Sequence, residues 1–405
     1  MIIWILNHYA ISPRSIGGTR HFDLAQELVK KGHTVKIFAS SFNHLERKET
    51  VTYTRKKSKE ETIDNVSFIW IKTPPYHNSL KRLVNISVFS LRLNNVLNKY
   101  LKKETPDLII GSSVHPLTPL IGLRKAKNVN SLFYFEERDL WPQTFIDFEV
   151  LSEKNIVTNI LFRIEKHLYK KSDRVIFLFE RAHEYAYTKG LEGHKHIYLP
   201  NGFNADRVDS KNTSKEVEEI LSLSKNKKLC MYVGSMGVAN NMMPLLKLAE
   251  SMREEDNYHF LFIGNGPLKP SFIKFKDNGK LTNISFHDPI SKNQIPYLLS
   301  HAHCGLISLK DSPLYNWGFS MNKIYDYLSL GLPIIMYSNL EDIGNLENSR
   351  GIFNSNSIEF LKDTLLANFK TDREEIRKFA LDHYSWGLLA ESLLLEVEKN
   401  RKTLK

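Results

Sequence analysis

Polar side chains recur at helical spacing in the stretch GFSMNKIYDYLSLGLPII (318–335). Ser320 is a favourable N-cap residue, Lys323 would lie in the first turn, and Asn322 and Asp326 would share one face. A helix N-terminus offers free N–H groups and the positive end of its dipole, so it attracts anions. These donors and a lysine suit a diphosphate, and a carboxylate one turn further suits the hydroxyls of a ribose. The pattern predicts a nucleoside-diphosphate site, and the alternative is a capped core helix with one solvated face.

Small residues follow apolar, strand-like runs at three other places. They are Gly17 and Gly18 in SIGGTRHF (15–22), Gly234 and Ser235 in YVGSMG (232–237), and Gly264, Asn265 and Gly266 in IGNGP (263–267). Backbone without bulky side chains can come close to a phosphate or a nucleoside, although a tight turn alone explains Gly-Gly equally well. The first of these stretches is not GxGxxG, and no acidic residue follows where a dinucleotide ribose would need one, which argues against a dehydrogenase.

Several charged residues are candidates for the same chemistry. Arg20 and Lys310 could share the charge of a diphosphate with Lys323. Arg138 and Asp139 follow an apolar run in EERDLWPQ (136–143), where they could act near the reacting bond or form a structural ion pair. The His, Asp and Glu residues show no spacing typical of a metal site, so we expect neither a metal nor another cofactor.

The elements that must position these residues alternate between strand and helix patterns along the whole chain. This alternation favours βαβ units and parallel sheets. We predict an α/β protein with two doubly wound Rossmann-like domains that face each other across a cleft, residues 1–200 and 201–384. A last helix, about 385–405, is expected to pack back on the first domain, and the domain boundary falls between about residues 185 and 225. Ligands of such sheets bind at the carboxyl ends of the strands.

The composition is that of an ordinary globular protein with a basic surplus. The chain has 405 residues, 42% of them hydrophobic, and a net charge of +11. This length favours two domains. Cys230 and Cys304 lie in apolar runs, so no disulfide framework is expected and the cytoplasm is the default compartment. The surplus charge indicates an anionic partner, such as nucleic acid, an acidic membrane face or a phosphorylated ligand, or it serves solubility alone.

One acid-free segment, KRLVNISVFSLRLNNVLNKYLKK (81–103), could be a membrane-binding helix. Ile86, Phe89, Leu93, Val96 and Tyr100 would form an apolar stripe. The basic residues on another face would be Lys81, Arg92, Lys99 and Lys103. Such a helix can lie on anionic lipid, which would make a polyprenyl-diphosphate-linked saccharide the expected acceptor. The alternative is a surface helix that packs on the first domain with its basic face in water.

Taken together, these motifs resemble the retaining glycosyltransferases of family 4, which have the GT-B fold. The likeness covers nearly the whole chain and is most specific in SMNKIYDYLSLGLPII (320–335), with Met321 where proline is usual. Other matching stretches are GGTRHFDLAQELVKKGHTVKIF (17–38), RDLWPQ (138–143) and LPNGF (199–203). Within the family the chain is most like the O-antigen and capsule branch that includes N-acetyl-L-fucosamine transferases.

This resemblance implies roles for the candidate residues. The C-terminal domain would hold the nucleotide-sugar, with Lys323 on the diphosphate and Asp326 on the ribose, and the N-terminal domain would hold the acceptor. Gly17 and Gly18 would approach the donor phosphates. Arg138 and Asp139 would take the place of a His-Asp pair near the reacting sugar, so they join Lys323 as catalytic candidates. The implied reaction is a metal-independent, retaining transfer from a nucleoside diphosphate, expected to be UDP, to a lipid-linked saccharide at the inner face of the cytoplasmic membrane.

The chain also departs from the family pattern. Of two family glutamates separated by seven residues, the second aligns with Asp326 and the first with Gly318, and GSMGVANN (234–241) lacks the usual basic residues. A glycine beside Trp317 and Phe319 favours a less hydroxylated sugar, such as a 6-deoxy or N-acetylamino sugar. Two rival functions stay open: a nucleotide-sugar 2-epimerase or sugar phosphorylase of the same fold, and a catalytically idle binder of nucleotide-sugars or anionic surfaces. The sequence shows no basic stretch interleaved with aromatic residues, so binding of nucleic acid is not favoured.

Overall fold

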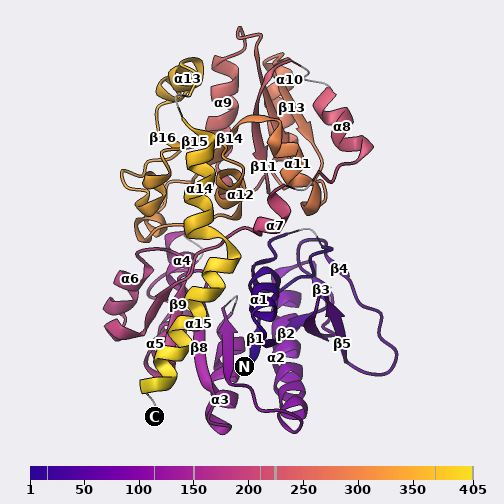
Figure 1. Cartoon of the computed structure of the whole chain (residues 1–405), viewed down its shortest axis with the longest axis vertical. Coiled ribbons are helices and arrows are strands. Elements are labelled where there is room, and N and C mark those ends of the chain that lie inside the picture. Colours follow the sequence, from indigo (N-terminus) through magenta and orange to yellow (C-terminus); the bar gives the residue numbers. More distant parts are fainter. Residues whose placement is uncertain are drawn as a thin grey trace. The chain divides into compact units, whose positions relative to one another are not determined.

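The computed structural model describes residues 1–15, 17–113, 115–148, 151–209, 211–222, 226–369 and 371–403. The chain divides into two compact units, each an α/β body (Figure 1). Unit 1 comprises Met1–Pro200, Trp317–Phe319 and Leu389–Lys405, and unit 2 comprises Asn201–Asn316 and Ser320–Leu388. Three residues from the middle of the second half, and the end of the chain, therefore belong to unit 1.

Unit 1 is built on an eight-stranded sheet with the order β10-β9-β8-β7-β1-β2-β6-β5. Its strands are β1 (Ile2–Leu6), β2 (Thr34–Ser40), β5 (Ser58–Ile63), β6 (Val66–Ile71), β7 (Leu108–Ser112), β8 (Leu132–Glu137), β9 (Arg174–Phe177) and β10 (His196–Tyr198), and a separate pair is formed by β3 (Phe42–Asn43) and β4 (Lys48–Glu49). All neighbours in the large sheet run parallel except β5 and β6. The apolar central strands are buried, as strands covered on both faces must be.

Two strands of this sheet lack the apolar, strand-length run on which the prediction of alternating strands and helices was based. β5 has the polar sequence SKEETI at the edge of the sheet, where alternating hydrophobicity is not needed. β10 has three residues, too few for a periodic pattern to be recognised. Both strands lie at the margins of the sheet, so the predicted parallel core of the first domain is confirmed without them.

The helices of unit 1 follow from the strand order. They are α1 (Arg20–Lys30), α2 (Ser79–Leu101), α3 (Leu117–Asn128), α4 (Gln143–Asp147), α5 (Ile156–Lys171), α6 (Ala182–Thr188) and most of α15 (Trp386–Thr403). The connections from β6 to β7, β7 to β8 and β8 to β9 all step in one direction across the sheet, and the connection from β1 to β2 steps the other way. Because such crossovers are right-handed, α2, α3 and α5 lie on one face and α1 on the other. Consistent with this, α3 packs against both α2 and α5.

Unit 2 has a six-stranded parallel sheet with the order β13-β12-β11-β14-β15-β16. Its strands are β11 (Lys228–Val233), β12 (Tyr258–Ile263), β13 (Ile284–His287), β14 (Ala302–Ser308), β15 (Ile334–Tyr337) and β16 (Ile352–Ser355). Its helices are α7 (Ala205–Val208), α8 (Lys215–Ser222), α9 (Met243–Ser251), α10 (Lys269–Asn278), α11 (Ile295–Ser300), α12 (Asn322–Ser329), α13 (Ile358–Leu366), α14 (Arg373–Tyr384) and the start of α15.

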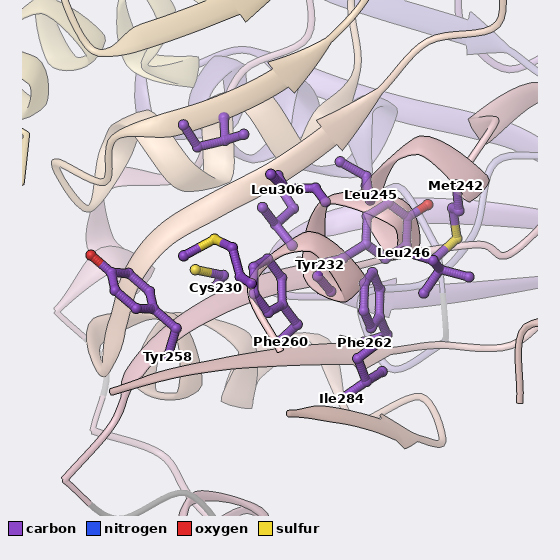
Figure 2. Close-up of a cluster of buried hydrophobic side chains, with 14 of the residues drawn as sticks. Cys230, Tyr232, Met242, Leu245, Leu246, Tyr258, Phe260, Phe262, Ile284 and Leu306 are labelled. Atoms are coloured by element: carbon purple, nitrogen blue, oxygen red, sulfur yellow. The ribbon is translucent and has the colours of Figure 1, made fainter. Parts of the chain in front are cut away.

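The core of unit 2 holds the carboxyl ends of β11, β12 and β14 in place. Figure 2 shows Cys230 and Tyr232 of β11 and Phe260 and Phe262 of β12 among apolar side chains of α9 and β14. Both cysteines are free and buried, as their apolar runs predicted. Burial of this many large side chains stabilises the sheet, so the loops that leave β11, β12 and β14 start from a rigid base.

Among the described residues, no helix is both long enough and apolar enough to pass through a lipid bilayer.

Candidate functional site

Helix α12 begins one residue later than predicted. Its N-cap is Met321, in extended backbone with φ −92° and ψ 127°, and no side chain caps the helix. The prediction that Ser320 is the N-cap is therefore wrong. Ser320 Oγ accepts a hydrogen bond from the N–H of Asn201 at 2.8 Å, and the Ser320 carbonyl accepts one from the Asn201 side chain at 2.7 Å. Asn201, from the LPNGF stretch, thus fixes the chain that leads into α12.

Tyr327 fixes α12 onto the sheet. Its hydroxyl accepts from the N–H of Val233 at 3.1 Å and contacts the carbonyl of Met231 at 3.3 Å. The ring lies against Gly305 of β14, where an added Cβ would come within 2.3 Å of it. This contact requires glycine at position 305. The start of α12 is therefore held near the carboxyl end of β11.

Lys323 projects from the first turn of α12 into an uncharged setting. Its Nζ donates to Tyr232 Oη at 3.0 Å and to Asn240 Oδ1 at 3.1 Å, and lies 4.2 Å from the centre of the Tyr232 ring. Burial lowers the pKa of Lys323 to about 7. The expectation of a full positive charge thus needs correction: near neutral pH the amino group is only partly protonated, and a nearby anion would raise its pKa.

The two glycine-rich loops of unit 2 have different roles. Gly234 lies beside the lysine, because an added Cβ would be 3.4 Å from Lys323 Nζ, and the next residue, Ser235, is exposed. Gly264 instead allows close contact between the two loops, since its Cβ would lie 1.8 Å from the carbonyl oxygen of Gly234. At Gly266 a Cβ would lie 2.5 Å from the backbone of Met236.

These contacts change the interpretation of IGNGP. Gly264 and Gly266 pack against the backbone of the YVGSMG loop and so support it. Asn265 is exposed, and its Oδ1 accepts from the N–H of Gly266 at 2.8 Å. The structure thus adds a supporting role for the two glycines, and the donor-binding role of the three residues stays a prediction.

The remaining candidates of unit 2 lie around the same helix start. Asn322 is exposed and Asp326 is half-buried one turn later. Lys310, half-buried, follows β14, and the preceding residues Ser308 and Leu309 are hydrogen-bonded to Asn241, the neighbour of the lysine partner Asn240. The fold thus brings Lys310 to the loop that contains Asn240.

Arg20 is buried in unit 1 and has structural partners. Its Nε donates to Glu136 Oε1 at 2.9 Å, and its terminal nitrogens donate to the carbonyls of Leu199 and Pro200. We therefore withdraw Arg20 from the donor site: it ties the end of β8 to the segment that precedes Asn201. Gly17, with φ +130°, and the exposed Gly18 lie in the loop before α1.

The charged residues at the end of β8 and just after it have different surroundings. Burial alone would raise the pKa of Glu136, but Arg20 and His21 outweigh burial and hold this pKa well below its usual range. The described part of the chain shows no ion pair between Arg138 and Asp139, so that alternative is not supported. The Arg138 N–H donates to Ser113 Oγ at 3.1 Å, and Asp139 is exposed.

The position of the missing glutamate is explained by the backbone. Gly318 has φ +95°, and an added Cβ would lie 3.1 Å from the backbone nitrogen of Glu180. Both features disfavour any L-residue there. The Trp317 ring packs on Tyr185 at 5.8 Å and Phe319 is buried, so the interpretation that these rings flank a sugar has no support.

The predicted basic helix is α2, which has the expected length but begins and ends two residues earlier than predicted. It spans Ser79–Leu101, so Lys103 lies beyond its end. Phe89, Leu93 and Tyr100 of the predicted apolar stripe are buried. This stripe packs on unit 1 and is not available to lipid, as the surface-helix alternative stated.

The basic residues of α2 differ in their surroundings. Lys81, Lys99 and Lys103 are exposed. Arg92 is half-buried, and its guanidinium donates to the carbonyl of Lys72.

The partners of Lys323 and Ser320 were not among the predicted site residues. Tyr232 and Asn240 face Lys323, and Asn201 holds Ser320, but these pairs are 91, 83 and 119 residues apart in the chain. No local spacing signals such contacts. Among the described residues, no group of three or more His, Cys, Asp and Glu side chains could hold a metal ion.

Comparisons with known proteins match both halves of the chain to glycosyltransferases. A family model described as Glycosyltransferase Family 4 matches residues 17–207, and one described as Glycosyl transferases group 1 matches residues 227–362. Among curated proteins, WcaI of Escherichia coli (strain K12), assigned as a colanic acid biosynthesis glycosyl transferase, is 21% identical over 297 residues, which cover 71% of this chain and 72% of WcaI.

Solved structures share the fold. Sucrose-phosphate synthase from Thermosynechococcus elongatus superposes with a TM-score of 0.72 at 15% identity, covering 100% of this chain and 98% of that chain. HepE of Anabaena, solved in complex with UDP, superposes with a TM-score of 0.66 at 12% identity, covering 98% of this chain and 100% of that chain.

The two Rossmann-like bodies and the solved structures that share them confirm the predicted GT-B fold, and the two family models identify a glycosyltransferase. The two family models together span most of the chain, one on each half. The chain belongs to glycosyltransferase family 4.

Proposed function

We propose that the protein transfers a sugar from a nucleoside diphosphate, UDP in the first instance, to a lipid-linked saccharide with retention of configuration. The observation that carries the proposal is Lys323, whose amino group has uncharged partners and lies at the N-terminus of α12. Burying an amino group without a counter-charge is unfavourable. A diphosphate at this helix start would supply the counter-charge and accept from the first backbone amides.

The other donor contacts follow from the same helix. Asp326, one turn after Asn322, would accept hydrogen bonds from the ribose hydroxyls. Gly234, Ser235 and Lys310 would lie beside the diphosphate, because Gly234 adjoins Lys323 and the Lys310 loop is joined to Asn241. The UDP complex of HepE supports UDP as the nucleotide to test first.

The proposed chemistry is mainly electrostatic. The bond between the anomeric carbon and the donor phosphate oxygen breaks, and the acceptor oxygen forms its bond to that carbon on the same face. Negative charge develops on the leaving diphosphate, where Lys323 and the helix amides stabilise it without a metal. The leaving phosphate oxygen takes the acceptor proton. Asp139, exposed at the end of β8, is the second candidate for this base, and Arg138 would stabilise charge nearby.

The acceptor and the location are proposed from a curated relative. WcaI is assigned to colanic acid biosynthesis, which favours a role in surface polysaccharide synthesis and hence a lipid-linked saccharide at the inner face of the cytoplasmic membrane. The acceptor would bind unit 1. Gly17 and Gly18 remain proposed neighbours of the donor phosphates. The resemblance to N-acetyl-L-fucosamine transferases, and not the Trp317–Phe319 stretch, makes a 6-deoxy or N-acetylamino sugar the first choice to test.

Calorimetric titration with UDP and with inorganic diphosphate tests the donor site. Lys323→Ala should weaken both ligands by roughly ten- to a hundredfold, because a hydrogen bond to a charged group contributes about 1.5–3 kcal/mol. Asp326→Asn should weaken UDP much more than diphosphate, because the carboxylate contacts ribose alone. Unchanged UDP affinity in Lys323→Ala, or equal losses of both ligands in Asp326→Asn, would contradict the assignment.

Assays with several UDP-sugars, with and without a lipid-linked acceptor and with EDTA, then separate the functions. Acceptor-dependent release of UDP that persists in EDTA supports transfer. Interconversion of the sugar without acceptor would identify the epimerase alternative, and tight binding without turnover of any donor would identify the idle binder.

A further inference from the structure

Helix α2 carries a second apolar set, which is exposed. Leu80, Leu83 and Val84 in its first turns are 77%, 60% and 54% exposed. They are spaced i, i+3 and i+4, so they share one face. This set differs from the buried stripe that holds α2 on unit 1.

Helix α5 repeats the feature. Ile156, Val157 and Ile160 in its first turns are 76%, 53% and 47% exposed. Six of the 17 large hydrophobic side chains that are exposed among the described residues lie at these two helix starts, and such clustering indicates an interaction surface.

The topology of unit 1 brings the two sets to the same edge. α2, α3 and α5 lie on one face of the sheet, each runs back from the carboxyl ends of the strands, and α3 packs between the other two. Their N-terminal turns therefore lie in a row at that edge, and Leu117, the first residue of α3, is 38% exposed between the two sets. We call this row the apolar rim. Figure 1 labels the three helices.

Helix length explains why the rim has no partner within unit 1. The 23 residues of α2 extend about 35 Å at 1.5 Å per residue. The five residues of β7 extend about 16 Å. The C-terminal end of α2 is joined to β7 at the amino edge of the sheet by a short connection. The first turns of α2 therefore project beyond the carboxyl edge, where no strand covers them.

The charges around the rim favour one occupant. α2 contains no acidic residue, and the one acidic residue of α5, Glu165, is buried. Lys81 and Arg163 are exposed on the two helices, and Lys154 and Glu153 are exposed just before α5. Aliphatic side chains with basic and few acidic neighbours match a bilayer that carries anionic headgroups.

We infer that the apolar rim inserts into an anionic membrane and so brings the carboxyl edge of unit 1 to a lipid-linked acceptor. The basic residues of α2 add attraction, and the aliphatic residues provide the insertion. This inference rests on the proposed function for its purpose, but the membrane contact itself does not depend on sugar transfer.

A fluorescent probe tests insertion directly. Both native cysteines are buried, so a Leu83→Cys or Val157→Cys variant can be labelled selectively with a polarity-sensitive dye. With vesicles of phosphatidylcholine and phosphatidylglycerol, both labels should shift to the blue and be quenched by a lipid-borne quencher. The matched control is Phe360→Cys, which is 52% exposed on α13 of unit 2 and should not respond. Labels at 83 and 157 that ignore the vesicles would overturn the inference.

Co-sedimentation separates the apolar from the electrostatic contribution. The triple variant Leu80→Ser, Leu83→Ser, Val84→Ser should lower the partition constant by about tenfold or more, because it removes the inserting aliphatic groups. Serine in place of Lys81, Arg92, Lys99 and Lys103 should weaken binding mainly at low salt, since the Debye length falls to about 3 Å at 1 M salt. Circular dichroism must show that both variants fold.

Two further outcomes are decisive. If the wild type dimerises in analytical ultracentrifugation and the triple Ser variant does not, the rim is an interface between copies and the inference is wrong. UDP titration of the triple variant keeps the two proposals distinct, because its UDP affinity should equal that of the wild type. A wild type that does not bind UDP would instead count against the proposed function.

Discussion

Lys323 has a phenol, an amide oxygen and a glycine as neighbours, and this setting links ligand binding to protonation. Its pKa of about 7 results from burial without a counter-charge. A bound diphosphate favours the charged form and so raises this pKa. At a pH above 7 the lysine must therefore take up a proton when the anion binds, whereas at lower pH it already carries one.

Binding of UDP should thus be coupled to proton uptake. Calorimetry in buffers of different ionisation enthalpy should show uptake approaching one proton per UDP at about pH 8 and little uptake at about pH 6. Lys323→Arg is the matched control, since arginine stays charged and should bind UDP without pH-dependent uptake. Equal proton uptake by the wild type and Lys323→Arg at about pH 8 would assign the proton to another group.

At the scale of elements, the segment before α12 carries an unusual constraint. Trp317–Phe319 belongs to unit 1, although the chain on either side belongs to unit 2. The Arg181 N–H donates to the Trp317 carbonyl at 3.1 Å, and Gly318 lies against the backbone at Glu180. Glycine at this position is thus explained by local packing.

Placing the family glutamate at position 318 should therefore destabilise the protein. Gly318→Glu should lower the free energy of unfolding by about 1–3 kcal/mol, because it forces an L-residue into a positive φ beside a backbone nitrogen. Urea unfolding measures the loss, and the rate of sugar transfer should not rise. Gly318→Ala is the control for backbone strain, because it adds the Cβ without a carboxylate. A stable Gly318→Glu variant with faster transfer would show that the segment adapts.

For the molecule as a whole, buried acids and histidines set the pH range of stability. Burial raises the pKa of Glu165 to about 8, and burial next to Glu165 raises the pKa of Glu137 well above its usual value. Tyr169 Oη donates to Glu137 at 2.5 Å, and Tyr185 Oη donates to Glu165 at 2.9 Å. On the acid side, burial lowers the pKa of His115 to about 3, so this ring is neutral in the folded state.

The buried carboxyls should make the protein less stable as the pH rises. Because burial raises the folded-state pKa of Glu165 to about 8, the folded state holds a proton that the unfolded chain has lost between about pH 4.5 and 8, and Glu137 acts in the same direction. The free energy of unfolding should fall across this window, by up to about 1.4 kcal/mol per pH unit for each proton. Urea midpoints at several pH values measure this slope.

Glu165→Gln should flatten that slope, because the amide resembles the protonated carboxyl and cannot ionise. Glu153→Gln, at an exposed position, is the control and should leave the slope unchanged. Parallel curves of urea midpoint against pH for the wild type and Glu165→Gln would show that Glu137 and Glu165 do not govern this loss of stability.

The fold was largely predictable because its signal is local. Apolar runs of strand length alternate with helical patterns, and the structure confirms β1, β2, β6 to β9 and all strands of unit 2 except β16 in those runs. Strands β3, β4, β5, β10 and β16 were missed, because polar or very short strands carry no such pattern. The position of α12 was also predictable, although its first residue was not.

The sequence by itself determined the order of elements, the parallel sheets and the family, since these follow from periodicity and from motifs within a few residues. The tertiary structure decided which charged groups are available. Arg20 meets Glu136 across 116 residues, and Lys323 meets Tyr232 across 91. It also decided that the regular stripe of α2 is buried while its first turns are exposed. Burial and the partners of a charge depend on chain segments far apart in the sequence, and those segments meet only when the protein folds.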